Sequence, residues 1–531
     1  MSRVSAHSPH VRIQEEDSPP RYLHYGEDFI RTPLPAGSRV IFPKPPMKPI
    51  DNVEAAIRYA INNPEGDGPP LYARLEPGMK VTIALDDISV PLPQMKRPDV
   101  RQRILEVVLE ELEKHGVEDV EMVIALALHR PMEESEVERM VGSDIFDEHY
   151  PETLYNMDAE DENNMVVLGE TEQGEEVQVV RRVAESDLLI YANVNFVPMN
   201  GGNKSIGTGL SGYRAIRHHH NPETILESNS YMDPDASELY DANRRQAEIL
   251  KDHVEVFHIE TALNNKMYDD PLMFLSKPEE EWTGTDKMKF RSMQWSLDKM
   301  PRAAKRKLFH SIPADYGVIG VHAGDTEPAH EKTLEKCWQQ HCVEVEGQSD
   351  VVIYGIPFAS PYNVNSILNP LLVRVMALGY FFNMYRNKPL VREGGTIIVA
   401  HPCYDDFDAE HHPSYIEFFN RVLPQTRDSA EMAHKWEEEF AHNPNYIEMY
   451  SNGNAYHGVH PFYMWYWAEN GQAHVGRVIV VGAENDHVPE RLGWETADSV
   501  QQALEMAEDD HGPEPDVSML HHPPFVMTEV T

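Results

Sequence analysis

Apolar runs of strand length alternate with amphipathic helical stretches along much of this 531-residue chain. Residues 78–87, 120–132 and 184–198 have the apolar patterns of strands. Residues 97–116 have helical periodicity and end at Gly116, a residue suited to the C-terminus of a helix. Strands that alternate with helices predict an α/β layer with a mostly parallel sheet.

The same alternation resumes in the second half of the chain. Residues 349–357, 394–403 and 477–485 are predicted strands, and residues 365–384 and 497–512 are predicted helices. The chain is longer than a single hydrophobic core usually allows. We therefore expect two α/β domains with mostly parallel sheets and the active site in the cleft between them.

Domain boundaries follow changes in composition. Residues 1–50 are rich in proline, serine and charge, and we expect an extended N-terminal arm. Residues 51–345 are the predicted N-terminal domain, and residues 346–531 are the predicted C-terminal α/β domain. Residues 265–315 carry many charges and no clear strand, which predicts an insertion or lid-like excursion within the first domain.

The charge balance is strongly acidic, with 46 Lys+Arg against 88 Asp+Glu and a formal net charge of −42. Such a field repels phosphate backbones, so we expect no nucleic-acid partner. The acidity fits general solvation of the surface, as in a salt-tolerant protein, better than metal storage, because no regular acidic repeat is present.

The expected compartment is the cytoplasm. The chain has no run of about 18 apolar residues, so no membrane span is expected. Its first residues have no apolar core of the kind that a secretion signal needs. Three cysteines (Cys337, Cys342 and Cys403) are too few and too scattered for a disulfide framework.

A glycine-rich loop follows the predicted strand over 184–198 and carries a single lysine, Lys204, after Gly201 and Gly202. Its spacing matches neither the Walker loop nor the dinucleotide fingerprint. Three interpretations are open: backbone brought close to an anion, a lysine that forms a covalent bond with a cofactor, or a tight turn with a solvated lysine.

Other polar residues fall at the predicted ends of strands, where parallel sheets bind ligands. Asp87 ends one strand and could bind a ligand or cap the next turn, and His129 ends another as either a base or a structural histidine. The run 218–220 is three histidines on a predicted helix, of which only one or two can face one site. His411 and His412 form a second pair beside several carboxylates.

Several motifs together resemble one known family in their order and spacing. They are ALDDISVPLP (84–93), ALALHRPM (125–132), LGETEQGEEVQVVRRVAESDLLI (168–190), GGNKSIGTGLSGYRAI (201–216) followed by His220, HAGDTEPAH (322–330), GGTIIVAHPC (394–403) and RVIVVGAEN (477–485). Over most of residues 70–510 the chain is similar to the nickel-dependent lactate racemases, as a longer and divergent member.

The resemblance implies a nickel-pincer nucleotide, a pyridinium mononucleotide with two thiocarbonyl arms that bind nickel. Lys204 matches the lysine that forms a thioamide with one arm, and His220 matches the histidine that completes the nickel site. An imidazole with sulfur donors suits square-planar nickel. We place Asp87, Gly201 and Gly202 in the cofactor-binding set. Proteins that synthesise the cofactor are then expected partners.

The implied reaction is racemisation or epimerisation of a 2-hydroxyacid. His129 matches the family's catalytic base, which removes the hydroxyl proton while hydride moves from C2 to the cofactor and later returns to the other face. The alternatives are an oxidoreductase that uses the same tethered cofactor in one direction, and a non-catalytic relative that binds a metal or nucleotide. The sequence does not give an oligomeric state.

Two departures from the family pattern favour a substrate other than lactate. The family's second histidine, some ten residues before the lysine, is replaced by a stretch with Asn193, Asn195 and Asn200. Val90 stands where an arginine that pairs with the substrate anion is expected. The Gln and Lys that hold the substrate carboxylate in the family have no clean equivalent within 360–371.

A replacement for the missing second base is expected in the C-terminal domain. The candidates are His401, His411, His412 and Tyr362. We rank His412 first, because a carboxylate of the acid-rich segment around it could orient its imidazole.

Overall fold

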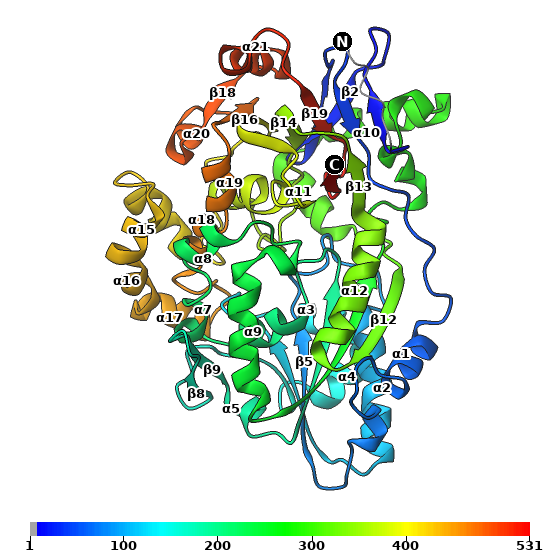
Figure 1. Cartoon of the computed structure of the whole chain (residues 1–531), viewed down its shortest axis with the longest axis vertical. Helices are drawn as coiled ribbons and strands as arrows, with labels where there is room; N and C mark the ends of the chain where they lie inside the picture. Colours follow the sequence, from blue (N-terminus) through cyan, green and yellow to red (C-terminus); the bar gives the residue numbers. More distant parts are fainter. Residues whose placement is uncertain (1–7) are drawn as a thin grey trace.

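The computed structural model describes residues 8–531. Residues 1–7, the start of the predicted arm over 1–50, lie outside the described residues. Within the described range, two large and mostly parallel sheets, one of six strands and one of seven, form the centres of the two halves of the molecule (Figure 1). This mixed α/β architecture agrees with the fold class predicted from the sequence.

The first sheet has the order β12-β11-β10-β5-β6-β7, and only β12 is antiparallel to its neighbour. Its strands are β5 (Lys80–Asp86), β6 (Asp119–Ala125), β7 (Leu154–Asn156), β10 (Leu188–Asn195), β11 (Glu255–Leu263) and β12 (Val318–Gly324). Every residue of β10 is buried, because helices cover both faces of a central parallel strand. The strands predicted over 78–87, 120–132 and 184–198 are confirmed as β5, β6 and β10.

Helices pack along this sheet. The helix predicted over 97–116 is confirmed as α2 (Val100–Lys114), with Asp99 as its N-cap and Gly116 at a positive φ just past its end. Helix α12 (Thr326–His341) packs on β11 and β12, and α9 (Glu238–Lys251) lies over the glycine-rich segment.

The second sheet has the order β1-β4-β19-β14-β16-β17-β18. Its strands are β1 (Val11–Ile13), β4 (Arg39–Ile41), β14 (Ser349–Gly355), β16 (Val391–Ala400), β17 (Arg477–Val481), β18 (Glu495–Ala497) and β19 (Val517–Leu520). The strands predicted in the second half are therefore confirmed, and the helix predicted over 497–512 is α21 (Val500–His511).

The described part of the N-terminal segment belongs to this second sheet and is not a free extended arm. Strand β4 pairs in parallel with β19, and β1 pairs antiparallel with β4. The apolar residues Val40, Ile41 and Phe42 are almost completely buried there. Figure 1 shows this first stretch of the chain beside β19 and the C-terminus. An edge position in a sheet supplies the backbone hydrogen bonds that an isolated arm would leave to water.

The predicted insertion over 265–315 is helical. In the described residues it contains no strand, as predicted, and its long helices are α10 (Gly284–Lys299) and α11 (Arg302–Ser311). It buries Trp282 and Phe290 against the hairpin of β2 (Arg21–Tyr25) and β3 (Asp28–Thr32), where Tyr22 stacks on Trp282 with ring centroids 5.5 Å apart. The insertion therefore covers the N-terminal hairpin.

Shorter elements complete the two halves. The strands are β8 (Met165–Glu170), β9 (Glu176–Val180), β13 (Cys342–Val345), β15 (Tyr385–Arg386) and β20 (Met527–Val530). The helices include α1 (Val53–Asn62), α3 (Glu134–Val141), α4 (Ser143–His149), α6 (Gly202–Lys204), α7 (Tyr213–Ile216), α8 (Pro222–Glu227), α14 (Pro413–Glu417), α17 (Pro444–Ser451), α18 (His460–Tyr466), α19 (Glu469–His474) and α20 (His487–Leu492).

Three local predictions differ from the structure. Strand β6 ends at Ala125, so His129 lies in the following loop, where the amide of Ala127 donates to Gly209 instead of continuing the ladder. Helix α7 ends at Ile216, so the run 218–220 lies in the turn after it. The helix predicted over 365–384 begins only at Pro370, after the N-cap Asn369, and continues as a π-helix over Val375–Phe381.

Candidate active site

A cavity lies at the carboxyl ends of β5, β6 and β10. It encloses about 110 Å³, and about 710 Å³ when its mouth is included. The first half of the chain supplies Asp86, Asp87, Ser89, Val90, Ala125, Leu126, Ala127, His129, Tyr191, Met199, Asn200, Lys204, Ser205, Thr208, Gly209 and His220. The second half supplies Pro361, Tyr362, Tyr380 and Trp467. The cavity brings together four of the predicted site residues: Asp87, His129, Lys204 and His220.

Lys204 ends the short helix α6 and is the one lysine that lines this cavity in the described chain. Burial lowers the pKa of its amine to about 8, and the nearby carboxylate of Asp86 opposes that shift. Within residues 8–531 the Nζ atom has no hydrogen-bond or ion-pair partner, and it lies 6.0 Å from the centroid of the Trp467 ring. A buried amine of this kind has the neutral fraction that a nucleophile needs.

Asp86 is held in place by β10. It accepts hydrogen bonds from the amide of Val194 (2.7 Å) and from Nδ2 of Asn193 (2.9 Å). Burial raises the pKa of Asp86 to about 6, against the lowering effect of these bonds. Asn193, which stands in the stretch where the family's second histidine is expected, therefore orients the carboxylate beside Lys204.

His129 and Asp87 form a hydrogen-bonded pair, with 2.8 Å between Nδ1 and Oδ2. Asp87 also accepts bonds from the amide and hydroxyl of Ser89. Burial alone would raise the pKa of Asp87, but the imidazole and these bonds outweigh it and lower the pKa. A carboxylate on Nδ1 keeps the proton there, which leaves the lone pair of Nε2 free to accept another proton.

Asp87 lines the cavity, and its role in cofactor binding stays a prediction. One of its oxygens bonds to Ser89 and the other to His129, so these contacts orient the imidazole.

His220 lies against the aromatic wall of the cavity. Its ring stacks on Trp467 with centroids 5.1 Å apart, and its Nδ1 is 2.7 Å from Nδ1 of His219. Burial lowers the pKa of His220 well below its usual range, so the ring is neutral at physiological pH. Among residues 8–531, Nε2 has no hydrogen-bond partner. His219 is itself buried, and its contact orients the His220 ring.

Gly201 and Gly202 do not line the cavity, and their cofactor-binding role stays a prediction. They have φ values of +93° and +58°, and a Cβ atom on Gly201 would lie 2.7 Å from Oε1 of Glu260. The amide of Gly202 donates to the same oxygen at 2.6 Å, and His330 also bonds to Glu260. These glycines let the chain turn tightly over a buried Glu–His pair, which fixes the start of α6.

His412 does not line the cavity either. It is fully buried, and its ring nitrogens bond to the hydroxyl of Ser366 (3.3 Å) and the carbonyl of Tyr362 (3.0 Å). This geometry does not favour the prediction of His412 as the second base. Of the other candidates, Tyr362 lines the cavity, whereas His401 and His411 do not.

The imidazole that reaches His129 from the second half is His460, which the sequence reasoning missed. The two ring centroids are 5.5 Å apart, and Nδ1 of His460 is 2.5 Å from the hydroxyl of Tyr415. His460, Tyr463 and Trp467 are spaced i, i+3 and i+7 along α18, so they share one face of that helix. This helical spacing within residues 460–467 (HPFYMWYW) is the sequence signal that could have predicted a contact of this segment with the site.

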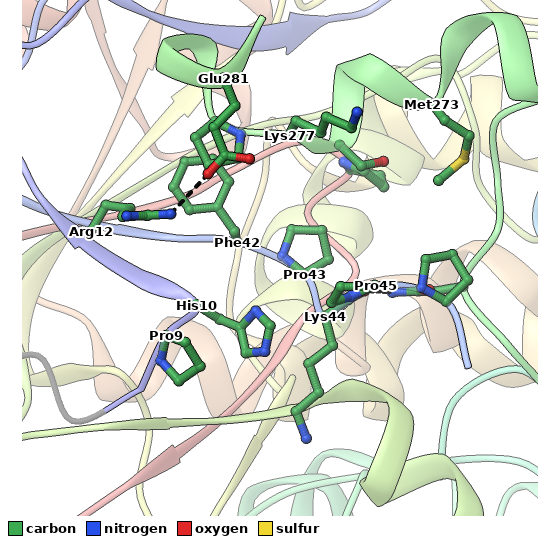
Figure 2. A pocket seen from close by; sticks show the side chains of 15 residues that line it. Pro9, His10, Arg12, Phe42, Pro43, Lys44, Pro45, Met273, Lys277 and Glu281 are labelled. Carbon is green, nitrogen blue, oxygen red and sulfur yellow. Dashed lines mark hydrogen bonds and ion pairs between the residues drawn. The ribbon is translucent and has the colours of Figure 1, made fainter. Parts of the chain in front are cut away.

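A second cavity, of about 350 Å³, lies apart from these residues between the N-terminal segment and the insertion (Figure 2). Arg12, Lys44 and Lys277 give it a cationic lining, and Arg12 pairs with Glu281 at 2.9 Å. None of the predicted site residues lines it.

Comparison with known proteins finds lactate racemases both in sequence and in fold. Residues 25–233 match the model of the lactate racemase N-terminal domain. The lactate racemase of Lactiplantibacillus plantarum is 28% identical over 110 residues, which are 20% of this chain and 25% of that protein. The matched segment thus spans about a quarter of that curated relative.

Two solved structures share the fold. The lactate racemase apoprotein from Thermoanaerobacterium thermosaccharolyticum has a TM-score of 0.61 at 18% identity, covering 96% of this chain and 99% of that one. A Thermotoga maritima protein solved by the Northeast Structural Genomics Consortium has a TM-score of 0.51 at 14% identity, covering 92% of this chain and 100% of that one. The match of residues 25–233, the curated relative and the shared fold all support the lactate racemase family that the motif resemblance predicts.

The described part of the chain contains no helix that is both long and apolar enough to span a bilayer.

Proposed function

We propose that this protein is a racemase or epimerase of a 2-hydroxyacid that works with a nickel-pincer nucleotide attached to Lys204. The observation that carries the proposal is one cavity that holds an unpaired, half-buried lysine, a neutral histidine with a free Nε2 and an Asp–His pair. Nothing in a purely structural cluster requires these three features to converge.

The residues present fit such a cofactor. Lys204 offers an amine with no competing partner in residues 8–531, and His220 offers one imidazole nitrogen in the same cavity. The described chain contains no group of three or more His, Cys, Asp or Glu side chains that could hold a metal unaided. The remaining nickel ligands would therefore come from the cofactor, which suits an arrangement with one protein nitrogen and soft donors.

His129 is the general base of the proposed reaction. Its Nε2 accepts the proton of the substrate's C2 hydroxyl, while the Nδ1–H bond to Asp87 holds the ring and stabilises the imidazolium. When bound, the cofactor supplies the acceptor for the C2 hydride and returns it. The same proton goes back to oxygen when hydride returns to the other face of C2, so the reaction is redox-neutral.

A one-directional oxidoreductase is the second candidate function. The observation in its favour is that His129 and His220 are the imidazoles that line the described cavity, so a single base faces the substrate once His220 binds nickel. The two functions differ in their product: an enantiopure hydroxyacid becomes racemic in one case and a ketoacid in the other. A non-catalytic relative would leave Lys204 unmodified.

Lactate is not the substrate that this cavity favours. Val90 lines it where the family's arginine is expected, and the lining contains no guanidinium. Met199, Pro361 and Trp467 give the lining apolar surface, which suits a larger group on C2.

The proposal is tested by mass spectrometry of the intact protein and of its Lys204 peptide, with nickel measured on the same sample. The protein is purified from its native host or co-expressed with the cofactor-synthesising proteins, which are the proposed partners. We expect a nucleotide-sized adduct on Lys204 and about one nickel per chain. K204R, which keeps the charge, should carry no adduct. Unmodified Lys204 in protein made with the cofactor available would contradict the proposal.

A further inference from the structure

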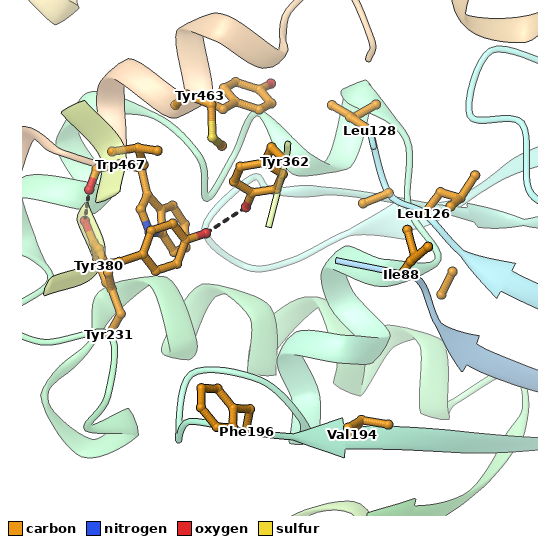
Figure 3. Close-up of a cluster of buried hydrophobic side chains, with 14 of the residues drawn as sticks. Ile88, Leu126, Leu128, Val194, Phe196, Tyr231, Tyr362, Tyr380, Tyr463 and Trp467 are labelled. Atoms are coloured by element: carbon orange, nitrogen blue, oxygen red, sulfur yellow. Dashed lines mark hydrogen bonds between the residues drawn. The ribbon is translucent and has the colours of Figure 1, made fainter. Parts of the chain in front are cut away.

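Two tyrosine hydroxyls meet at the wall of the cavity. The hydroxyls of Tyr362 and Tyr380 are 2.8 Å apart, and both residues line the cavity. Tyr362 follows β14, and Tyr380 lies in the π-helix over Val375–Phe381. Figure 3 shows this hydrogen bond as a dashed line beside Trp467. The second half of the molecule therefore presents a polar pair within an otherwise aromatic wall.

The pair has one hydrogen-bond donor to spare. Burial raises the pKa of both tyrosines, so each hydroxyl keeps its hydrogen at physiological pH. One hydrogen makes the bond between the two oxygens, and the other has no acceptor among residues 8–531. A buried O–H without an acceptor costs free energy unless a ligand supplies one.

Two other hydroxyls of the lining are already committed. Ser89 donates to Asp87, and Thr208 donates to Oδ1 of Asn243 at 2.7 Å. Neither is free to bind a substrate oxygen without losing a protein partner. Ser205 accepts from Asn193 and is bonded to Tyr191, so that pair also keeps one hydroxyl hydrogen and is a rival to Tyr362 and Tyr380.

No cationic side chain of the lining remains for a carboxylate once the proposed cofactor is in place. Lys204 would be acylated and His220 would bind nickel, while His129 receives the hydroxyl proton. Asn200 is a lining side chain whose amide has no partner within the described residues, which makes it a further rival donor.

We propose that the Tyr362–Tyr380 hydroxyl pair binds the carboxylate of the substrate, in the place of the family's missing arginine. This inference rests on the proposed function and deepens it by naming a substrate class. The spare hydroxyl hydrogen of this pair can be donated to one carboxylate, and the pair offers no charge for a second. The substrate is therefore a monocarboxylic 2-hydroxyacid, with an apolar or aromatic group packed against Trp467 and Met199.

The test measures the binding of racemic mandelate to cofactor-loaded protein by calorimetry, together with KM and kcat for each enantiomer. A racemic ligand undergoes no net conversion, so the heat reports binding alone. The variants are Y362F and Y380F, which remove one hydroxyl and keep the ring. Y354F is the matched control, because Tyr354 is also buried and its hydroxyl donates to the backbone carbonyl of Ala377 in the same π-helix at 2.8 Å.

We expect Y362F and Y380F each to raise the Kd and KM for mandelate by about 10–100-fold, the usual value of a hydrogen bond to a charged group. The change in kcat should be smaller, because the pair holds the substrate away from the reacting C2–H bond. Binding of 1-phenylethanol, which lacks the carboxylate, should not change. Y354F should match wild type with both ligands.

Several results would overturn the inference. They are a Kd within twofold of wild type for both tyrosine variants, an equal loss of 1-phenylethanol binding, or a larger loss in N200A than in Y380F. Failure of loaded wild type to bind mandelate would overturn the assigned substrate class. Each of these leaves the proposed function intact, because that function fails by a different result, the absence of the Lys204 adduct in wild type.

Discussion

The titration of Lys204 gives a direct measure of the environment that the cavity creates. Burial lowers the pKa of this amine from the usual 10.5 to about 8, and Asp86 limits the shift. Below pH 8, this difference leaves about 300-fold more neutral amine than an ordinary lysine would have. Because only the neutral amine reacts with acylating reagents, Lys204 should become reactive as pH rises through about 8.

The assay is pulsed acetylation of the apo protein with isotopically labelled acetic anhydride between pH 6 and 11, followed by peptide mass spectrometry. Exposed lysines in the same digest are the internal reference. D86N should move the midpoint of Lys204 further down, because the carboxylate that favours the ammonium form is lost. D87N is the matched control: the neighbouring carboxylate pairs with His129 and is not a cause of the Lys204 shift.

The lowered pKa of Lys204 also predicts that its charged form destabilises the folded protein, whereas a lysine in a salt bridge would stabilise it. In the unfolded chain Lys204 titrates near 10.5, so burying its charged form opposes folding below about pH 8. K204M should therefore raise the free energy of unfolding at pH 7 by at most about 3 kcal/mol. The gain should shrink as pH rises from 8 to 10.5. An acetylation midpoint near 10.5, or an upward shift in D86N, would refute the reasoning.

Three further predictions concern the geometry around the cavity. D87N should lower kcat about 10–100-fold with little change in nickel content, because His129 loses the group that fixes its tautomer; an unchanged kcat would contradict the orienting role. G201A should lower the melting temperature and the yield of Lys204 adduct, at a cost of about 2 kcal/mol or more, because Cβ at this positive φ meets side-chain atoms within 3 Å. Normal stability of G201A, measured by calorimetry, would show that the turn can relax. H460Q should shift the imidazole NMR signals of His129 in the apo protein, whereas H412Q should not, because His460 is in ring contact with His129 and His412 is not. Equal shifts in the two variants would contradict that contact.

Much of the architecture could be predicted from local sequence. The strand runs and helices of both halves follow from hydrophobic periodicity, which is a property of neighbouring residues. The family match of residues 25–233 agrees with motifs read along the chain. The convergence of Lys204, His129 and Asp87 follows from the rule that parallel strands present their carboxyl ends at one edge of a sheet.

Errors arose where backbone partners come from distant segments. The N-terminal strands belong to the second sheet because β4 pairs in parallel with β19, where Arg39 lies opposite Ser518. The loop after β6 bonds to Gly209 instead of extending the strand. Such pairings depend on the closed fold, and no pattern within either segment encodes them.

By itself, the sequence determined the α/β class, the acidic surface and the spacing that places a lysine and a histidine in one glycine-rich segment. Only the tertiary structure decided which side chains touch. In the folded protein, Asp87 bonds to His129 and Tyr362 bonds to Tyr380. The imidazole in ring contact with His129 is that of His460, whereas the sequence reasoning had ranked His412 first. The physical reason is that hydrogen bonds and ring contacts depend on distances of a few ångströms, which are set when separate helices and strands pack together.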